Sequence, residues 1–337
     1  MRTAHTDLIT QARAGDGDAF RQLTEPYRRE LHVHCYRMLG SFQDAEDALQ
    51  DTFLSAWQAI ARFQERASIR TWLYRIATNR CLDTLRSASR RPAEPWDLTE
   101  IEPPSPSRLG EVAWLEPFPD ALLDGAVGSP PGPAARYEQT EAISLAFVAA
   151  LQVLPTRQLA VLILRDVLGY PAKEVAAMLD TTVESVTSAL KRARAGLHRR
   201  LAPDADHEPP PAPGSPTEQA LVTRFTKAYA SGDIDGLLAL LTDDAVVSMP
   251  PIPLEYHGRK DVTRFYTTVL RPGWTYDFVP TRANGQPALG TYVHTPTGLR
   301  HGIGLVVLTL SGDRISAITR FDAGVLASFG LPSALAK

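Results

Sequence analysis

Apolar residues recur at intervals of three and four over residues 7–90, the spacing that places them on one face of an α-helix. No proline interrupts this stretch after Pro26, and proline inside a helix removes a backbone hydrogen bond. The same periodicity returns over residues 136–201. The pattern predicts two all-helical domains, at residues 1–90 and 136–202.

From about residue 217 the pattern changes. Two helical stretches, EQALVTRFTKAYASG and IDGLLALLTDDA, come first. Strand-like runs follow, among them AVVSM, TYDFVP, LGTYVHT, GIGLVVLTL and RISAITRF, and turn residues such as Ser311-Gly312-Asp313 separate several of them. Helices followed by several antiparallel-looking strands predict an α+β domain at residues 217–337.

Two proline-rich segments, residues 91–135 and 203–216, separate these three domains. The first is acidic and too rich in proline for a helix, which predicts a linker. It contains the island WLEPFPD, residues 114–120, whose two aromatic rings are costly to leave in water, so we expect them to dock. The second segment, PDADHEPPPAPGSP, predicts a disordered linker.

Composition sets wide limits on function. The 337 residues carry a formal net charge of −3, which does not exclude nucleic acid because local charge matters more than the total. The two cysteines, Cys35 and Cys81, have no metal-ligand spacing and fit a reducing compartment. No stretch reaches the ~18 apolar residues of a membrane span, and the N-terminus lacks a long apolar signal region. We expect a soluble, cytoplasmic protein that does not contact a membrane.

The stretch KEVAAMLDTTVESVTSALKRARAGLHRR places apolar residues on one face of each of two helices that meet at Asp180. Aspartate tolerates left-handed backbone better than most residues, as a tight reversal requires. This is a helix-turn-helix pattern, whose second helix fits the major groove of DNA, although a helical hairpin with a solvated basic face gives the same pattern. The candidate DNA-binding residues are Lys173, Thr182, Glu184, Ser185, Ser188, Lys191, Arg192 and Arg194.

A second candidate region precedes it. FQDAEDALQDTFLSAWQAI predicts an amphipathic helix with an acidic stripe, which is either a solvated face or a docking surface for a basic partner. The following RFQERASIRTWLYRIATNRCLDTLR interleaves aromatic residues with arginines, a combination that suits single-stranded DNA. Core packing explains Trp72 and Tyr74 equally well, because their neighbours also follow a helical core pattern.

Three segments together resemble the extracytoplasmic-function (ECF) sigma factors of the sigma-70 family: DAEDALQDTFLSAW, FQERASIRTWLYRIATNRCLDTLR and LPTRQLAVLILRDVLGYPAKEVAAMLDTTVESVTSALKRARAGL. Their order and spacing match the family's regions 2 and 4. The island WLEPFPD, the stretch MPPIPLEYHGR and the tetrad 284–287 resemble the sigma G/sigma J type, which carries a SnoaL-like extension. A related pattern often reads Asn-Gly-Arg-Pro at the tetrad, and Gln286 departs from it.

The resemblance implies a sigma factor that binds core RNA polymerase, at its clamp helices and flap, and directs initiation at promoter DNA. The acidic helix would bind the clamp helices, the following loop and helix would open and read the −10 element, and the helix-turn-helix would read the −35 element. The polymerase contacts would be Asp44, Asp47, Leu49, Gln50, Asp51 and Phe53. The −10 contacts would be Phe63, Arg66, Ser68, Arg70, Trp72, Arg75, Asn79 and Arg80.

For residues 217–337 the resemblance implies a ketosteroid-isomerase-like, cone-shaped α+β barrel with a pocket, open to an unknown small ligand. The acid–base candidates Asp243, Asp244, His257, His294 and His301 are scattered, so we expect no catalysis, no cofactor and no metal. We expect a regulatory domain that touches the island or region 2, alters polymerase binding and makes a separate anti-sigma factor unnecessary. The regulatory contacts would be Trp114, Leu115, Glu116, Pro117, Asn284, Gly285, Gln286 and Pro287.

Two alternatives remain open at this point. One is a free-standing helix-turn-helix regulator that senses a small molecule through its C-terminal domain. The other is a SnoaL-like cyclase or isomerase with a DNA-binding tether. The acidic helix discriminates, because only the sigma factor needs it.

Overall fold

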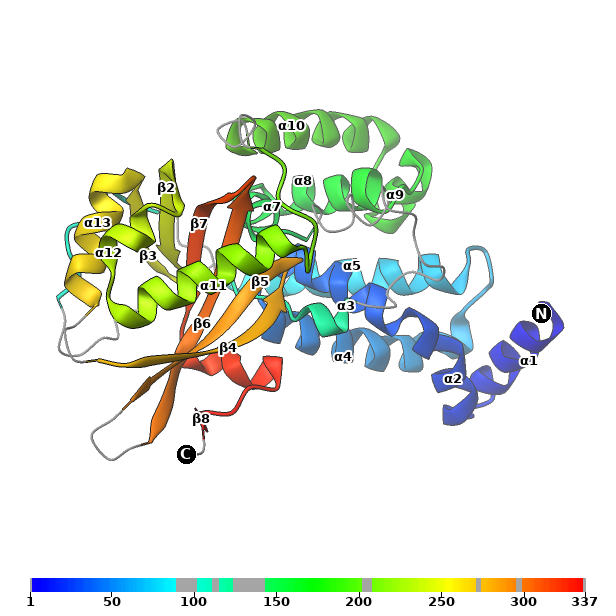
Figure 1. Ribbon diagram of the computed structural model, residues 1–337. Helices are drawn as coiled ribbons and strands as arrows, with labels where there is room; N and C mark the ends of the chain where they lie inside the picture. The colour runs from blue at the N-terminus through cyan, green and yellow to red at the C-terminus, as the bar shows by residue number, and fades with distance from the viewer. Residues whose placement is uncertain are drawn as a thin grey trace. The chain divides into compact units, whose positions relative to one another are not determined.

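A computed structural model of the chain describes residues 2–88, 102–110, 115–123, 143–201, 208–270, 274–294 and 299–335 (Figure 1). The chain divides into two compact units, each described by itself below. The first unit comprises residues 1–91, 122–142 and 146–202, and the second comprises residues 92–121, 143–145 and 203–337. The second unit therefore includes most of the chain that the sequence assigns to linkers.

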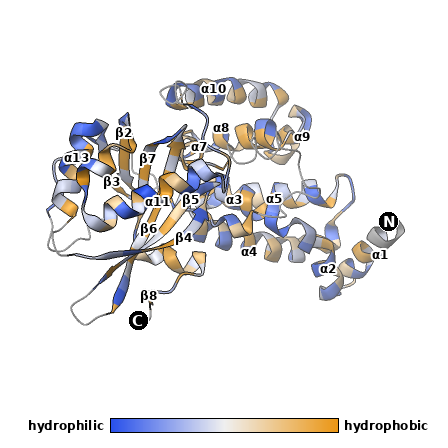
Figure 2. Cartoon of the chain, viewed as in Figure 1, coloured by the Kyte–Doolittle hydropathy of each residue, from blue (hydrophilic) through white to orange (hydrophobic). Residues whose placement is uncertain are grey.

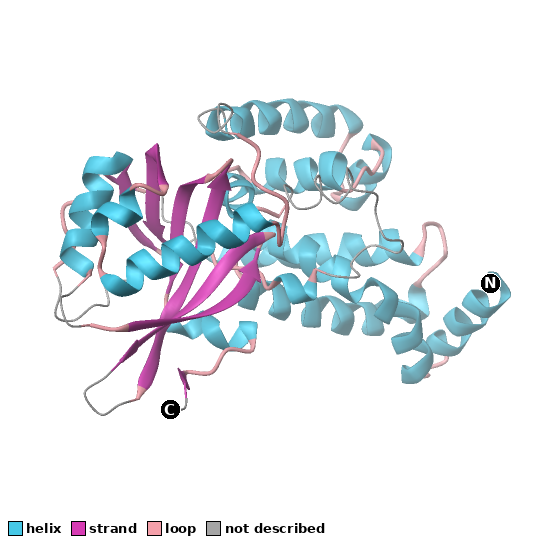
Figure 3. Ribbon diagram, viewed as in Figure 1, coloured by secondary structure: helices cyan, strands magenta, loops and turns pink. Residues whose placement is uncertain are grey.

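The N-terminal part of the first unit is a helical bundle (Figure 3). Tyr36, Leu73 and Ala77 are among its fully buried side chains. The Oγ of Ser41 accepts a hydrogen bond from the N–H of Asp44 at 3.1 Å and so caps the acidic helix predicted from the sequence. The elements are α1 (Arg2–Arg13), α2 (Gly17–Thr24), η1 (Glu25–Tyr27), α3 (Arg28–Leu39), α4 (Phe42–Ala59), η2 (Ile60–Arg62) and α5 (Ile69–Ala88).

The C-terminal part of the first unit contains the predicted helix-turn-helix. Asp180 has φ +49°, which confirms the left-handed reversal expected at this position. Hydrophobic and hydrophilic residues alternate along the second helix of the motif (Figure 2), and Val186, Leu190 and Ala193 form its buried face. The elements are α7 (Leu145–Gln152), α8 (Thr156–Leu162), the π-helical η4 (Ile163–Val167), α9 (Ala172–Met178) and α10 (Val183–Leu201).

The second unit is the predicted α+β domain, three helices with a mixed sheet. The strand order is β1-β3-β2-β7-β6-β5-β4, β8 pairs with β6, and only β2 and β7 run parallel among the strand pairs of the described residues. The helices are α11 (Pro216–Ser231), α12 (Ile234–Leu238) and α13 (Gly258–Val269), with η3 (Asp120–Leu122) and η6 (Ala323–Phe329). The strands are β1 (Arg108–Leu109), β2 (Leu241–Met249), β3 (Ile252–His257), β4 (Tyr276–Ala283), β5 (Gln286–His294), β6 (Arg300–Ser311), β7 (Arg314–Phe321) and β8 (Ala334–Leu335).

Aromatic side chains fill the space between α11, α13 and β4. The ring of Tyr229 stands edge-on to those of Tyr266, Tyr276 and Phe278, with centroids 5.2 to 6.0 Å apart. Such contacts add about 0.5–1.5 kcal/mol per pair beyond area burial. In the described part of this domain, residues of both helices and of the sheet therefore share one hydrophobic core.

Two sequence predictions for this unit need correction. The predicted second helix extends too far, because α12 ends at Leu238 and the segment from Leu241 is strand β2, which pairs with β7. The predicted disorder of residues 203–216 is wrong for residues 208–216. There the N–H of Gly312 donates to the carbonyl of Pro209 at 3.2 Å, and prolines lower the entropic cost of ordering an extended chain.

Candidate functional site

The acidic face of α4 is open and carries an apolar residue that sequence reasoning missed. Asp47, Gln50 and Asp51 are exposed, whereas Leu49 is only 5 % exposed and belongs to the core. Leu54 is 56 % exposed and lies three residues after Asp51, on the same side of the helix. Its position outside the buried stripe of the helix is the sequence signal that could have revealed it.

Phe53, another predicted polymerase contact, is half-buried. The guanidinium of Arg28 lies 4.9 Å from the centre of its ring, within the range of a cation–π interaction. The ring therefore packs within the bundle. Asp44 lies in the first turn of α4, where a carboxylate is favourable at a helix N-terminus.

The loop between η2 and α5 is held by a residue that sequence reasoning did not identify. Arg13 donates to the carbonyl of Phe63 and forms an ion pair with Glu65 at 3.0 Å, and Glu65 has φ +55°. The Phe63 ring is 7 % exposed and lies 4.8 Å from that of Trp72. Both rings thus have a packing role, while Arg66 in the same loop is exposed.

Helix α5 presents basic and polar groups beyond this loop. The Oγ of Ser68 accepts the N–H of Thr71 at 3.0 Å, so Ser68 acts as the N-cap of the helix. Arg75, Asn79 and Arg80 are exposed. Arg75 and Asn79, four residues apart, share one side of the helix, whereas Arg80 lies about 100° further round it and pairs with Asp83 at 3.9 Å. Together with Arg66 and Ser68 of the preceding loop, these three are the predicted −10 residues that are exposed.

Arg70 is engaged inside the protein. Its Nε donates to Glu30 Oε1 at 2.9 Å and its Nη2 donates to Glu30 Oε2 at 3.0 Å. Its Nη1 donates to the hydroxyl of Tyr170 at 3.2 Å, and the guanidinium lies 4.8 Å from the ring centre of Tyr74. Partial burial lowers the pKa of Arg70, but hydrogen bonding to Glu30, together with the electrostatic influence of Tyr74, Tyr170 and Glu30, outweighs it and raises the pKa above its usual value.

Most of the candidate −35 residues lie on α10, while Lys173 lies on α9 and Thr182 directly precedes α10. The Oγ1 of Thr182 accepts the N–H of Ser185 at 3.2 Å, which gives Thr182 a capping role. Arg194 forms a two-pronged ion pair with Asp166, at 2.8 and 2.7 Å, and so braces α10 against η4. The exposed set also includes Lys173, Glu184, Ser185, Ser188, Lys191 and Arg192.

The linker island docks on the turn between β4 and β5. The backbone of Phe118 exchanges hydrogen bonds with Asn284: its N–H donates to Asn284 Oδ1 at 2.8 Å, and its carbonyl accepts the Asn284 N–H at 2.9 Å. Phe118 and Asn284 are both fully buried, and Asn284 has φ +56°, a backbone region that asparagine tolerates. Trp114 lies outside the described residues, whereas Leu115 and Pro117 are buried and Glu116 is half-buried.

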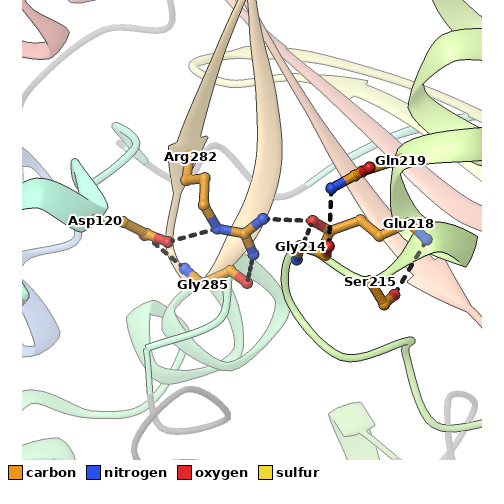
Figure 4. A network of polar contacts seen from close by, with 7 residues as sticks. All are labelled: Asp120, Gly214, Ser215, Glu218, Gln219, Arg282 and Gly285. Atoms are coloured by element: carbon orange, nitrogen blue, oxygen red, sulfur yellow. Dashed lines mark hydrogen bonds and ion pairs between the residues drawn. The ribbon is translucent and has the colours of Figure 1, made fainter.

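A charged network continues this contact (Figure 4). Asp120 accepts the N–H of Gly285 at 2.8 Å and the Nε of Arg282 at 3.3 Å. Gln286, the departure from the related tetrad, donates to Thr309 Oγ1 at 2.9 Å. Pro287 is buried on β5, opposite Arg282 in the strand register.

An earlier part of the same linker adds strand β1 to the edge of the sheet. Ser107 and Gly110 donate backbone hydrogen bonds to the carbonyls of Glu255 and Pro253 on β3, both at 2.9 Å. Arg108 pairs with the Glu255 carboxylate at 2.6 Å. Sequence reasoning did not find this strand, because two residues beside prolines carry no strand signal.

The acid–base candidates of this domain stay at the surface. Asp243 is 92 % exposed in its side chain and pairs with Arg259 at 2.9 Å, and His294 pairs with Asp277 at 2.8 Å. Asp244 and His301 are exposed, and His257 is half-exposed. None of the five has the buried setting of a catalytic acid or base in enzymes of related fold.

Within the described residues, no helix has the length and apolar character that a membrane span requires. No group of three or more histidine, cysteine, aspartate or glutamate side chains in that part of the chain could hold a metal ion.

The domains of this chain are those of a sigma-70-type protein joined to a SnoaL-like domain, as three family models show. The chain matches the family models for Sigma-70 region 2 over residues 23–91, Sigma-70 region 4 over residues 144–197, and the SnoaL-like domain over residues 222–326. It is 41 % identical to the ECF RNA polymerase sigma factor SigG of Mycobacterium tuberculosis (strain ATCC 25618 / H37Rv), over 96 % of this chain and 86 % of SigG. The chain therefore belongs to the ECF RNA polymerase sigma factor family, and the free-standing regulator is not favoured.

Two further relatives agree with this assignment. The ECF RNA polymerase sigma factor SigM of the same strain is 33 % identical over 58 % of this chain and 83 % of its own length. The crystal structure of the Mycobacterium tuberculosis extracytoplasmic function sigma factor SigJ aligns with a TM-score of 0.59 and 20 % identity, over 91 % of this chain and 98 % of that one. At that identity the SigJ structure supports the fold alone.

Proposed function

We propose that this sigma factor docks on the clamp helices of core RNA polymerase through one face of α4, formed by Asp47, Gln50, Asp51 and Leu54. The observation that carries the proposal is an exposed leucine surrounded by exposed acidic and amide groups, since a central apolar contact with a polar rim is the common plan of protein interfaces. Two exposed acids at this spacing repel each other slightly in the free protein and gain from a basic partner.

Charge reversal tests this docking face. Core polymerase should retain the full-length wild-type chain in a binding assay and direct transcription from the promoter of its own gene or a neighbouring gene. Asp47→Lys combined with Asp51→Lys should abolish both, because like charges would then face a basic partner. Asp313→Lys is the matched control, since Asp313 is an exposed carboxylate between β6 and β7, outside the helical bundle that contains α4. Equal retention of the double variant would contradict the proposal.

For promoter DNA we propose a division of roles between two helices. Arg75, Asn79 and Arg80 of α5 would follow the opened strand at the −10 element, where exposed cations and a polar amide suit a single strand. Residues near the start of α10, such as Ser185, would meet base edges of the −35 element, and Lys191 would meet phosphate further along.

We further propose that the SnoaL-like domain regulates rather than catalyses, and that the docked island is the element it controls. Asn284 satisfies both backbone groups of Phe118 at a fully buried position, so releasing the island leaves several polar groups unpaired. A variant Asn284→Ala should raise protease cleavage in the linker and change promoter output in the same samples. Unchanged cleavage and output together would exclude this role.

We also propose the domain limits, the cellular location and the mode of regulation of this chain. The domain limits are residues 1–90, 136–202 and 217–337. The chain works in the cytoplasm with its polymerase, and its own C-terminal domain takes the place of a separate anti-sigma factor. A small ligand of the C-terminal domain stays a prediction without a named site.

A further inference from the structure

The turn between β4 and β5 holds three segments that are far apart in the chain. Residues 282–285, which we call the clasp, bind the linker island through Asn284 and Gly285, as described above. Asn284 also binds Ile143, just before region 4 (residues 144–197 by the family model), and Arg282 binds Glu218 in α11, the helix that follows region 4 in the chain. Region 4 is therefore a loop of chain with both ends fastened at one place in the second unit.

The N-terminal fastening is a single buried hydrogen bond. The side-chain Nδ2 of Asn284 donates to the carbonyl of Ile143 at 2.7 Å. Ile143 is 2 % exposed, and the first helix of region 4, α7, begins only two residues later at Leu145. Only Ser144 separates Ile143 from helix α7, so the start of region 4 can move only a few ångströms from Asn284 while this hydrogen bond holds.

The C-terminal fastening is ionic. Arg282 Nη1 donates to Glu218 Oε1 at 2.7 Å, and the same oxygen accepts the N–H of Gly214 at 2.9 Å (Figure 4). The adjoining segment is also bound at Pro209, by the N–H of Gly312. From Leu201, where α10 ends, only residues 202–207 precede the segment bound at the second unit, and a chain of that length spans at most about 25 Å.

Arg282 joins the C-terminal fastening electrostatically to the linker island, whose Phe118 is bound by Asn284. Its guanidinium lies between the carboxylates of Glu218 and Asp120, and its Nη2 donates to the carbonyl of Gly285 at 2.8 Å. The side chain of Glu218 is 7 % exposed and that of Asp120 is 21 % exposed, so water screens the pair weakly. Removing this one cation leaves two carboxylates without their shared partner and loosens the chain on both sides of region 4.

We propose that the clasp sets the distance at which region 4 can stand from the rest of the protein, and so limits which spacings of the −10 and −35 elements the sigma factor reads. The inference rests on the proposed reading of these elements by α5 and α10. Each added base pair moves the −35 element by about 3.4 Å and turns it by about 35° relative to the −10 element. A region held at both ends follows such a change poorly, whereas a region held at one end follows it more freely.

A spacer series tests the proposal with the full chain bound to core polymerase. Templates carry the same −10 and −35 sequences with the spacer lengthened or shortened by one and two base pairs. Arg282→Gln should raise transcription from the off-length templates, relative to the best one, by about fivefold, the low end of typical coupling between sites. Arg300→Gln is the matched control: Arg300 is 29 % exposed in its side chain, against 31 % for Arg282, and also pairs with a carboxylate, that of Asp277. It should leave the spacer profile unchanged.

Two results would contradict the proposal that the clasp limits promoter spacing. One is a spacer profile of Arg282→Gln that coincides with that of the wild type. The other is a loss by the same factor on every template, which indicates a general structural defect rather than a change in spacing.

Amide hydrogen exchange on the free full-length chain tests, independently of transcription, whether the clasp holds the chain on both sides of region 4. Arg282→Gln should speed exchange at residues 115–123, 143–152 and 214–219 together, while Arg300→Gln should not. Faster exchange at only one end of region 4 would also overturn the proposal. If the wild type activates no promoter with core polymerase, the proposed function fails, and the exchange result still decides whether the clasp exists.

Discussion

The guanidinium of Arg70 and the hydroxyl of Tyr170 are joined by a hydrogen bond of 3.2 Å, which links α5 of region 2 to the loop before α9 of region 4. The Tyr170 ring also meets that of Tyr74 edge-on, with centroids 5.7 Å apart. The −10 and −35 elements lie about 25 base pairs apart, which is about 85 Å of duplex. A sigma factor that reads both elements therefore has to break this contact.

Tyr170→Phe should open the first unit. The variant keeps the ring and loses only the hydroxyl, so the closed contact should weaken by about 1 kcal/mol, roughly a fivefold shift in population. Fluorescence energy transfer between dyes at Gln58→Cys and His198→Cys, both exposed positions, would report the opening. Tyr292→Phe is the control, because it removes a hydroxyl hydrogen bond of 2.9 Å inside the second unit. Identical energy transfer in the wild type and in Tyr170→Phe would show that the Arg70–Tyr170 hydrogen bond does not hold region 2 and region 4 together.

Acid should destabilise region 2 through His34. Complete burial, with smaller contributions from Arg37 and Arg70, lowers the pKa of His34 from 6.5 to about 3, and its Nε2 lies 2.9 Å from Thr78 Oγ1. The unfolded chain takes up a proton below pH 6.5 and the folded chain does not. Stability is therefore complete above about pH 6.5 and falls by up to about 1.4 kcal/mol per unit as the pH drops toward 3.

A non-titrating variant tests this dependence. His34→Gln should flatten the fall of the region 2 urea midpoint between pH 6.5 and 4.5, although the variant is less stable near neutral pH. His198→Gln, at an exposed position on α10, should keep the wild-type slope. A slope unchanged by His34→Gln would show that other groups carry the acid sensitivity, among them His32, whose burial lowers its pKa to about 4.

Leu54 should be a central contact with core polymerase. Replacing it by asparagine removes an exposed apolar side chain without disturbing the bundle, so folding should change by less than about 0.5 kcal/mol while affinity for core falls at least tenfold. Titration of labelled core polymerase would measure this loss. Leu109, which is 72 % exposed on β1, supplies the control position for an equivalent substitution. Wild-type affinity of Leu54→Asn would remove the leucine from the interface.

Local patterns predicted the helices well because helical periodicity is short-range. They placed the reversal at Asp180 and assigned the aromatic cluster of α5 two roles, of which the structure shows packing for Trp72 against Phe63. They could not show that Arg70 is engaged in hydrogen bonds with Glu30, because forty residues separate the two in sequence. The docked linker was equally hidden, since its partners lie on Asn284 and Gly285, about 165 residues away. The run AVVSM within β2 was predicted as a strand, but the start of β2 was missed because Leu241 follows α12 without a turn signal.

The two kinds of DNA contact proposed for α10 should separate by their salt dependence. Lys191 is exposed near the middle of the helix, at the start of its basic part, where a cation would meet phosphate. Each phosphate contact contributes about 0.9 to the slope of log affinity against log salt. Lys191→Ala should therefore lower the slope by about 1 and weaken every promoter alike. Ser185→Ala should leave the slope unchanged and relax discrimination at one −35 position by about 1–3 kcal/mol.

Binding of holoenzyme to promoter variants over a range of salt concentrations measures both effects. Lys227→Ala is the control for lost charge, because Lys227 is exposed on α11 of the SnoaL-like domain. If Lys191→Ala changed sequence preference and Ser185→Ala changed the salt slope, the assignment of phosphate and base contacts along α10 would have to be reversed. Such a result would place the C-terminal half of the helix, rather than its start, in the major groove.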